Sequence, residues 1–576
     1  MAMTQNTSSK HVSPSAPAST DTTQSDHPAL ESPVEDHLGG GGLDRVVFGI
    51  TAALAVGFLI WGFVDTGSLG SVSSSALDWT VTSMGWLFVL TASAFVVFVI
   101  WLALGRFGDI PLGNDDEKPE FSTVSWVAMM FSAGMGIGLM FYGVSEPLSH
   151  FVTPPPGTGG QGGSGAVQTA MATTLFHWTL HPWAIYAVVG IAISYGVYRK
   201  GRPQLISAAF TPLIGKRRAE GPAGRLIDIL AIFATLFGSA ASLGLGALQI
   251  GSGLQIVGGL GKVGNGLLVA IIAVLTAAFI ASAISGVEKG IQWLSNINMV
   301  LAIALAGFVF VVGPTVFILD LIPTAVGSYF QDLAQMSART DAAGGDGMAK
   351  WLSGWTVFYW AWWLSWTPFV GMFIARISRG RTIRQFVTGV LLVPSMVSLV
   401  WFAIFGGAAI HMQQHGIDLG GQSSPESQLF GMLDQLPLSM VTGVLVMVLV
   451  AIFFVSGADA ASIVMGTLSE RGTLHPSKWT VIFWGIATGG VAAVMLLIGG
   501  DSALTGLQNI TIVAALPFVL VMIGLCFALV KDLRADPLMV RRKYAAEAVE
   551  QAVVEGVTRH GDDFSISVEK TDDSAG

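Results

Sequence analysis

The chain has little of what a soluble enzyme depends on. Only 11% of its 576 residues are charged, and it contains one cysteine, Cys526. A single cysteine forms no intramolecular disulfide, and this one lies in an apolar run as a small packing residue. The sequence has no HExxH, CxxC, GxSxG or Walker A motif, and no nucleophile paired with a base. We therefore expect a protein that is not an enzyme.

Long apolar runs take the place of these features. Hydrophobic residues make up 52% of the chain, and runs of about 20 apolar residues match the length that a helix needs to cross the hydrocarbon core. The runs are too long and too continuously apolar for barrel strands. They predict an all-α polytopic membrane protein. Its twelve predicted spans lie near residues 45–64, 84–105, 121–148, 168–198, 226–255, 267–285, 292–322, 352–375, 386–410, 438–468, 479–499 and 503–530.

The basic residues predict how the chain is oriented in the membrane. Of 28 lysines and arginines, only Lys262, Arg339 and Lys350 fall on the side opposite the termini, which predicts that both termini are cytoplasmic. Residues 1–44 are rich in Ser, Thr, Pro and acidic residues, and they predict a disordered arm. The net charge of -9 comes largely from the tails and short loops, and it implies no nucleic-acid partner.

The most informative segment is an apolar stretch that contains a cluster of tryptophans. Residues 355–376 read WTVFYWAWWLSWTPFVGMFIAR, without a charge before Arg376. Several indole faces together can hold a quaternary ammonium group, which neither donates a hydrogen bond nor loses its charge. The alternative is an aromatic belt at the membrane interface. A second aromatic set at residues 176–186, FHWTLHPWAIY, favours a site for a methylated cation.

Three glycines interrupt the third apolar run. Gly134, Gly136 and Gly138 each cost about 1 kcal/mol in a helix interior relative to Ala. The run is therefore expected either to unwind and expose backbone groups to a ligand, or to pack closely against another helix. Unwinding would offer carbonyl groups to a cation and N–H groups to a carboxylate.

Few ionisable residues lie within the apolar runs, and these are functional candidates by default. Glu146 either has such a role or, with Pro147 beside it, marks the end of a helix. Asp459 could pair with an arginine as part of an inner gate. His177 and His181 are isolated in the sequence and predict no metal site.

Two segments outside the spans are predicted to be helical. Residues between Pro323 and Lys350 are amphipathic and predict an interfacial helix outside the membrane. Beyond Arg534 the chain has the composition of a cytoplasmic helix, in which charges of both signs alternate. Because the acidic residues dilute the basic ones, we expect at most weak control of activity by this tail.

Four segments together resemble one transporter family. They read AGMGIGLMFYGVSEPL, LFHWTLHPWAIY, FGSAASLGLGALQIGSG and FYWAWWLSWTPFVGMFIARISRGRTIR. They resemble the betaine/choline/carnitine transporter (BCCT) family, most closely its sodium-coupled glycine betaine carriers from actinobacteria. The resemblance covers about residues 45–535. It implies twelve transmembrane helices in the bacterial plasma membrane, a leucine-transporter-type fold with two inverted five-helix repeats, and a homotrimer.

The resemblance also implies a division of the chain. Residues 45–120 would form two peripheral transmembrane helices. Residues 121–350 would form the first repeat with the external amphipathic helix, and residues 351–533 the second repeat. Residues 534–576 would form the partly helical cytoplasmic tail.

A substrate site follows from the same resemblance. The aromatic residues that match the family's betaine box are Trp178, Trp183, Tyr186 and Trp363. Further substrate contacts are expected from Trp362, Trp366 and Phe373 along the pathway and from Gly134, Gly136 and Gly138 in the glycine run. Proton-coupled choline carriers of the family carry Asp at the position of Gly138. The glycine here favours Na+ as the coupling ion.

Two sodium sites are implied as well. The residues that match the first site are Ser132, Met135, Phe453, Ser456 and Gly457, and those that match the second are Ser239, Thr488 and Phe369. The family pattern has a hydroxyl residue where this chain has Gly457. Because a hard cation needs oxygen ligands, we expect the first site to bind Na+ more weakly than the second.

These features predict a symporter that imports a zwitterionic quaternary-ammonium compound, most closely glycine betaine, together with Na+ in osmotic stress protection. A carrier of the same family for ectoine, proline, carnitine or choline, or one with altered ion coupling, remains an alternative. A channel is disfavoured because the sequence has no ring of like charges and no filter motif. A sensor would need a soluble output domain, for which the tails are too short.

Overall fold

The computed structural model describes residues 42–134, 136–158, 164–285, 288–421 and 424–566. Within these ranges the secondary structure is helical, apart from one isolated antiparallel bridge between Pro111 and Thr382. Residues 1–41, nearly all of the predicted arm, lie outside them. The helices up to the middle of the chain are α1 (Arg45–Val64), α2 (Thr66–Leu104), α3 (Thr123–Gly134), α4 (Ile137–Val152), α5 (Ser164–Trp178), α6 (Leu180–Ser194), α7 (Thr211–Ile214), α8 (Lys216–Ala219), α9 (Pro222–Ile256) and α10 (Asn265–Ser285).

The second half of the chain continues in the same way. Its helices are α11 (Glu288–Val312), α12 (Thr315–Ser337), α13 (Gly345–Gly354), α14 (Thr356–Arg376), α15 (Ile383–Gln414), α16 (Pro425–Asp434), α17 (Ser439–Ser469), α18 (Lys478–Ile498), α19 (Ala503–Arg534) and α20 (Pro537–His560).

Many of these helices have the length and composition of membrane spans. In the described part of the chain, nine helical segments are long and apolar enough to cross a membrane, or ten if the bent pair α11 and α12 forms one span. The protein is therefore a multi-pass helical membrane protein. Besides the bent pair, two of the twelve predicted spans fail this criterion for visible reasons. The third is divided into α3 and α4, of 12 and 16 residues, and α14 is rich in Trp and Tyr, which count as less apolar than aliphatic side chains.

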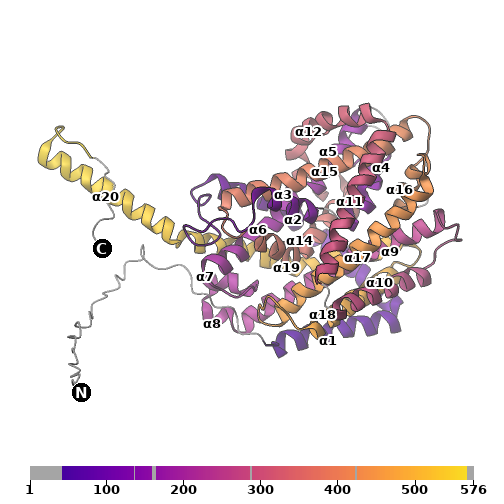
Figure 1. The fold of residues 1–576 in the computed structure, drawn as a ribbon, viewed down its shortest axis with the longest axis horizontal. Helices are drawn as coiled ribbons and strands as arrows, with labels where there is room; N and C mark the ends of the chain where they lie inside the picture. The colour runs from indigo at the N-terminus through magenta and orange to yellow at the C-terminus, as the bar shows by residue number, and fades with distance from the viewer. Residues whose placement is uncertain (1–41, 135, 159–163, 286–287, 422–423, 567–576) are drawn as a thin grey trace, which may run out of the picture. The chain divides into compact units, whose positions relative to one another are not determined.

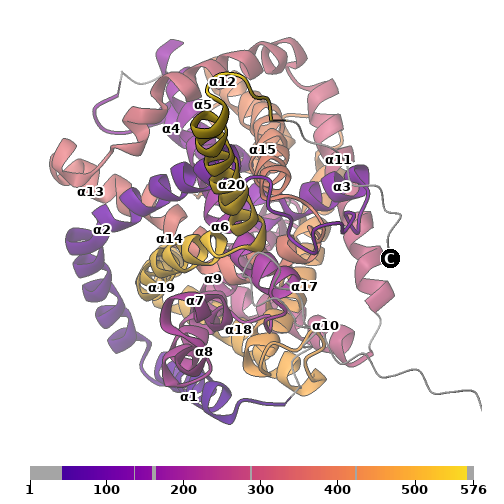
Figure 2. The ribbon, with the colours of Figure 1, turned by 90° about the vertical axis from the view of Figure 1, so that its left-hand side faces the viewer.

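The described residues between 42 and 534 form one compact unit. In it, α6, α9 and α14 lie among the other helices, whereas α1 and α2 run along one side (Figures 1 and 2). The residues of α6 are almost all buried, which a helix that is apolar all round requires. By contrast, α1 exposes large apolar side chains such as Ile60 and Val64, as expected of a surface covered by lipid.

The seventh predicted run, residues 292–322, is wrong at its end. The axes of α11 and α12 bend by 109° at Gly313 and Pro314. Proline lacks an N–H group and disfavours helical geometry in the residue before it. The amphipathic helix α12 therefore begins at Thr315 rather than near Pro323, and α13 is a separate short helix.

The predicted tail helix is α20. Its N-cap residue Asp536 accepts a hydrogen bond from the N–H group of Leu538 at 2.9 Å, and nearly all of its side chains are exposed. Lys543 pairs with Glu547 at 3.6 Å, one turn further along the helix. Basic and acidic side chains thus lie side by side on this helix.

Candidate functional site

Two interrupted helices contribute residues to one central cavity. Between α3 and α4, Gly136 is fully extended (φ -177°, ψ -177°) and forms the N-cap of α4 without a side-chain cap. Between α5 and α6, Thr179 leaves helical geometry (φ -115°, ψ -107°). The first break is one of the two outcomes that the glycine run predicts, the other being close helix packing. The sequence also held a signal for the second break, because Pro182 lacks the N–H group that would bond to the carbonyl group of Trp178.

The cavity between the breaks is lined by aromatic rings. It has a volume of about 40 Å³, and its lining includes all four predicted box residues. Trp362 and Trp363 stack with ring centroids 4.6 Å apart, and the ring of Trp178 approaches Trp363 edge-on at 4.9 Å. We call this group of six rings the aromatic cage: Trp178, Trp183, Tyr186, Trp362, Trp363 and Trp366.

Small residues complete the lining of the cage. Gly136 and Gly138 belong to it, together with Ser398 of α15, which sequence reasoning did not single out. A Cβ atom on Gly138 would lie 2.8 Å from the Cη2 atoms of both Trp178 and Trp362. The absence of a side chain at this position therefore lets the rings approach the backbone of α4.

Most indole N–H groups of the cage are held by protein acceptors, so that the ring faces remain available to a ligand. Trp183 and Tyr186 form an edge-to-face pair at 5.4 Å. In the described part of the chain, neither the indole N–H group of Trp183 nor the hydroxyl group of Tyr186 donates a hydrogen bond. The four anchored donors and their acceptors are Trp178 to Glu146 Oε2 (2.6 Å), Trp362 to Ser242 Oγ (3.0 Å), Trp363 to the carbonyl of His177 (3.0 Å) and Trp366 to the carbonyl of Gly238 (3.0 Å).

Trp360 does not take part in the cage, although it belongs to the same tryptophan-rich segment. Its side chain is fully buried, and its ring stacks on the imidazole of His181 at 4.9 Å. His181 is thus a packing partner of an indole. The helical repeat of α14 explains why Trp362, Trp363 and Trp366 face the cavity and Trp360 does not.

Glu146 is the centre of a buried polar network behind Trp178. Its Oε2 atom also accepts a hydrogen bond from the hydroxyl group of Tyr359, and its Oε1 atom lies 2.6 Å from Nδ1 of His177. The Nε2 atom of His177 lies 2.9 Å from the hydroxyl oxygen of Thr356. Glu146 therefore does not mark a helix end, since α4 continues to Val152, and His177 is not isolated. Glu146 and His177 are 31 positions apart, so the sequence near either residue does not indicate that they are in contact.

His150 lies at the edge of this network. Its Nε2 atom is 3.5 Å from Glu146 Oε1, and the possible ligand atoms of Glu146, His150 and His177 all lie within 4.8 Å of one another. Such a set could hold a metal ion by composition. Glu146 and His177 are joined by a short hydrogen bond of 2.6 Å, whereas neither ring nitrogen of His150 has a hydrogen-bond partner among the described residues.

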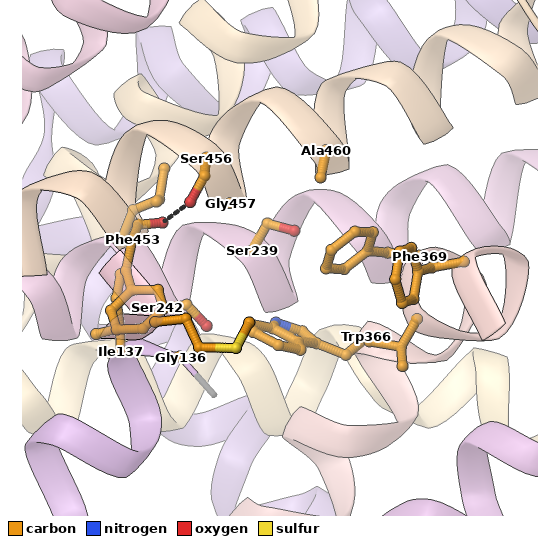
Figure 3. Close-up of a pocket in the computed structure, with 14 residues that line it drawn as sticks. Gly136, Ile137, Ser239, Ser242, Trp366, Phe369, Phe453, Ser456, Gly457 and Ala460 are labelled. Atoms are coloured by element: carbon orange, nitrogen blue, oxygen red, sulfur yellow. Dashed lines mark hydrogen bonds between the residues drawn. The ribbon is translucent and has the colours of Figure 1, made fainter. Parts of the chain in front are cut away.

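A larger cavity of about 200 Å³ adjoins the cage and shares Gly136, Trp366 and Val370 with it. Ser456 and Gly457 of α17 and Ser239 of α9 line it (Figure 3). The hydroxyl group of Ser456 donates to the carbonyl groups of Ile452 at 2.9 Å and of Phe453 at 3.3 Å. The predicted sodium and pathway residues that the structure brings together here are Ser239, Phe369, Phe373, Phe453, Ser456 and Gly457.

The remaining predicted ligands are not part of this lining. Thr488 is buried in α18, and its hydroxyl group donates to the carbonyl of Trp484 at 2.7 Å. Met135 lies outside the described residues. Ser132 and Gly134 belong to α3, but their side chains and surroundings also lie outside what the structure describes.

An apolar helical bundle that holds a buried aromatic cage between two broken helices has the features of a multi-pass membrane transporter. The chain belongs to the BCCT family: the model of the betaine/carnitine/choline family transporters matches residues 46–538. It is therefore a transporter and not an enzyme.

Several named relatives agree with this assignment. The betaine/ectoine transporter LcoP of Corynebacterium glutamicum is 48% identical over 93% of this chain and 85% of its own. The glycine betaine transporter OpuD of Bacillus subtilis is 46% identical over 85% of this chain and 94% of its own. Glycine betaine transporter 1 of Vibrio parahaemolyticus is 39% identical over 87% of this chain and 96% of its own.

Proposed function

We propose that this chain is a secondary symporter that imports a zwitterionic quaternary-ammonium solute, with glycine betaine as the first candidate, and that it serves osmotic protection. The aromatic cage is the observation that carries the proposal. Anchored indoles present their faces to the cavity, and such faces attract a desolvated methylated cation. No acidic side chain belongs to the described lining of the cage, which suits a zwitterion better than a solute with a net positive charge.

The start of α4 offers a partner for the carboxylate of such a solute. The first N–H group of α4 with an acceptor in the helix is that of Met140, which bonds to the carbonyl of Gly136. Within the described part of the chain, the N–H groups of Ile137, Gly138 and Leu139 have no helical acceptor, and all three residues lie at the cavities. Free N–H groups at a helix start bind carboxylates. The two ends of a zwitterion thus find complementary partners.

We further propose Na+ as the coupling ion. The side chains of Ser239, Ser242 and Ser456 bring hydroxyl groups to the larger cavity. Oxygen ligands of this kind suit a hard cation. A proton-coupled mechanism of the family would place a carboxylate at Gly138, where this chain has no side chain.

The proposed architecture is twelve transmembrane helices with both termini in the cytoplasm. Nine spans are found by length and hydropathy. The broken pair α3 and α4, counted as one span, and the helices α11 and α14 would bring the number to twelve. In a leucine-transporter-type fold with two inverted repeats, the α3–α4 pair and α14 would hold equivalent places, next to the substrate. A homotrimer is part of the same proposal.

Ectoine is a second candidate because LcoP, a relative 48% identical, is named a betaine/ectoine transporter. Ectoine carries its positive charge on a flat ring, which aromatic faces can also stack against. The two candidates differ in the shape of the cation. Competition between them for one site is the measurement that ranks them.

Uptake by purified protein in proteoliposomes tests the proposal. Labelled glycine betaine and ectoine are supplied with an inward gradient of Na+, K+ or H+, and we expect accumulation with Na+ alone. Trp363→Leu should weaken solute binding about thirtyfold, because a desolvated cation–π contact contributes about 2 kcal/mol. Trp360→Leu removes an indole outside the cage and is the matched control. Accumulation without Na+, or unchanged affinity in Trp363→Leu, would contradict the proposal.

A further inference from the structure

A third cavity lies apart from the cage, between the middle of α5 and the C-terminal end of α12. Its volume is about 180 Å³. Unlike the two apolar cavities, it is lined chiefly by polar side chains. The polar residues of the lining are Thr158, Thr169, Thr173, Asp332, Gln335 and Arg339.

Arg339 brings a buried positive charge to this cavity. The residue is only 8% exposed, and its Nη1 atom is buried without a hydrogen-bond partner. Within the described part of the chain no carboxylate forms an ion pair with it, and its guanidinium contacts the ring of Trp351, with Cζ 5.6 Å from the ring centroid. An arginine does not lose its proton in a protein, so that a buried guanidinium without a counter-charge is strongly unfavourable.

Asp332 is the one acidic residue in the described lining, and it forms no ion pair with Arg339 there. Burial lowers the pKa of the Arg339 guanidinium below its ordinary value, and the attraction of the Asp332 carboxylate opposes this shift without cancelling it. The guanidinium of Arg339 and the carboxylate of Asp332 thus line one cavity without forming an ion pair in the described part of the chain.

Thr173 offers a second donor to the same cavity. Its side chain is fully buried on α5, and its hydroxyl group also has no hydrogen-bond partner. Buried hydroxyl groups are nearly always bonded. The charged guanidinium of Arg339 and the neutral hydroxyl group of Thr173 are therefore two donors without a hydrogen-bond partner in one cavity that has room for a small ion.

We propose that this cavity binds a small monovalent anion, a halide or a carboxylate, between the guanidinium of Arg339 and the hydroxyl group of Thr173. Both classes accept N–H and O–H donors, and both supply the missing negative charge. The carboxylate can come from a free organic acid or from a transported zwitterion. A bound anion ties α12 to α5, the helix that ends at the cage residue Trp178.

Thermal unfolding of the purified full-length protein tests this site. Sodium chloride or sodium acetate replaces a bulky sulfonate salt, such as sodium MES, at constant Na+ and ionic strength. Because a ligand that binds only the folded state stabilises it, the Tm of the wild type should rise with the anion and reach a plateau. Arg339→Gln and Thr173→Val should abolish or reduce this rise. In MES, Arg339→Gln should be at least as stable as the wild type, because it removes a buried charge.

Lys350→Gln is the matched control, since it removes an exposed positive charge from the following helix, α13, and should keep the wild-type response. A Tm that does not depend on the anion would overturn the proposal, as would an equal rise in Arg339→Gln.

Fluorescence gives an independent readout at the site. Iodide at the guanidinium should quench Trp351, and the part of the signal due to Trp351 is the difference between the wild type and Trp351→Phe. Chloride should compete with iodide for this quenching at constant ionic strength. Glycine betaine added to Trp363→Leu, whose cage is impaired, shows whether the carboxylate of a zwitterion competes as well. Competition by either anion supports the site, and quenching that neither relieves would refute it.

Discussion

The indole N–H group of Trp178 donates a 2.6 Å hydrogen bond to Oε2 of the fully buried Glu146. One wall of the aromatic cage is therefore fixed by a carboxylate from another helix. The bond polarises the indole, because an acceptor with negative charge increases the electron density of its donor. Glu146 is thereby expected to act as a positioning residue that also strengthens the attraction of the cage for a cation.

Glu146→Gln is expected to weaken solute binding about tenfold or more. Glutamine offers one acceptor oxygen where Trp178, Tyr359 and His177 share two, and a bond to a charged group contributes about 1.5–3 kcal/mol. Tyr359→Phe removes one donor but leaves the bond to Trp178, so that a smaller effect is expected. Solute titration of tryptophan fluorescence gives both affinities. If Tyr359→Phe is the more harmful change, the orientation of Trp178 is not what Glu146 controls.

Gly138→Ala should reduce the affinity for a trimethylated solute about tenfold or more. Its Cβ atom would lie 2.8 Å from two anchored rings, and overpacking of this kind costs about 1–3 kcal/mol. Gly136→Ala is the matched control, because a Cβ atom there meets nothing within 4 Å and the extended backbone accepts any residue. Uptake kinetics should show a raised KM only for Gly138→Ala. Equal effects of the two changes would argue that the glycines serve backbone flexibility.

Gly457→Ser should lower the Na+ concentration for half-maximal uptake about fivefold, the effect of about 1 kcal/mol of added ion binding. A Cβ atom at Gly457 meets nothing within 4 Å, so that the added hydroxyl group has room to turn toward the ion. Gly457→Ala adds the same carbon without the oxygen and should leave the Na+ dependence unchanged. The measurement is uptake at saturating solute over a range of Na+. A serine variant that behaves like the alanine variant would remove this position from the ion site.

Deletion of residues 540–576 should change stress-stimulated uptake only slightly. Along α20 the basic residues Lys543 and Arg559 each pair with a glutamate one turn away, which leaves little net positive charge for an anionic membrane surface to attract. The measurement is uptake by the truncated and complete chains at low and high external osmolality. A large loss of stimulation with basal uptake retained would establish the tail as an osmotic sensor.

Much of the site could be predicted where one residue type determines the local geometry. The glycine run predicted either the break before α4 or close helix packing, because glycine destabilises a helix wherever it occurs. The tryptophans of α14 predicted a cage, and their spacing on a helix explains which of them face it. The bend between α11 and α12 was missed although Gly313 and Pro314 form a recognised breaker pair. A long apolar run hid that local signal.

What could not be predicted depends on contacts between distant residues. Glu146 and His177 are far apart in the sequence, and nothing near either residue indicates the other. Ser398 reaches the cage only because α15 packs against α4 and α6. The buried charge of Arg339 became visible only when the packing of α12 on α5 was known. Tertiary packing determines all three.

The unequal anchoring of the cage rings has a consequence for the divergence of substrate preference. Replacing Trp178 or Trp363 would leave a buried carboxylate or carbonyl group without its donor, at a cost to folding as well as to binding. Trp183 and Tyr186 on α6 hold no such partner in the described part of the chain. Substitutions that adapt the cage to bulkier, smaller or flatter solutes should therefore destabilise the protein least on α6. There, one ring can be replaced while the rest of the cage remains intact.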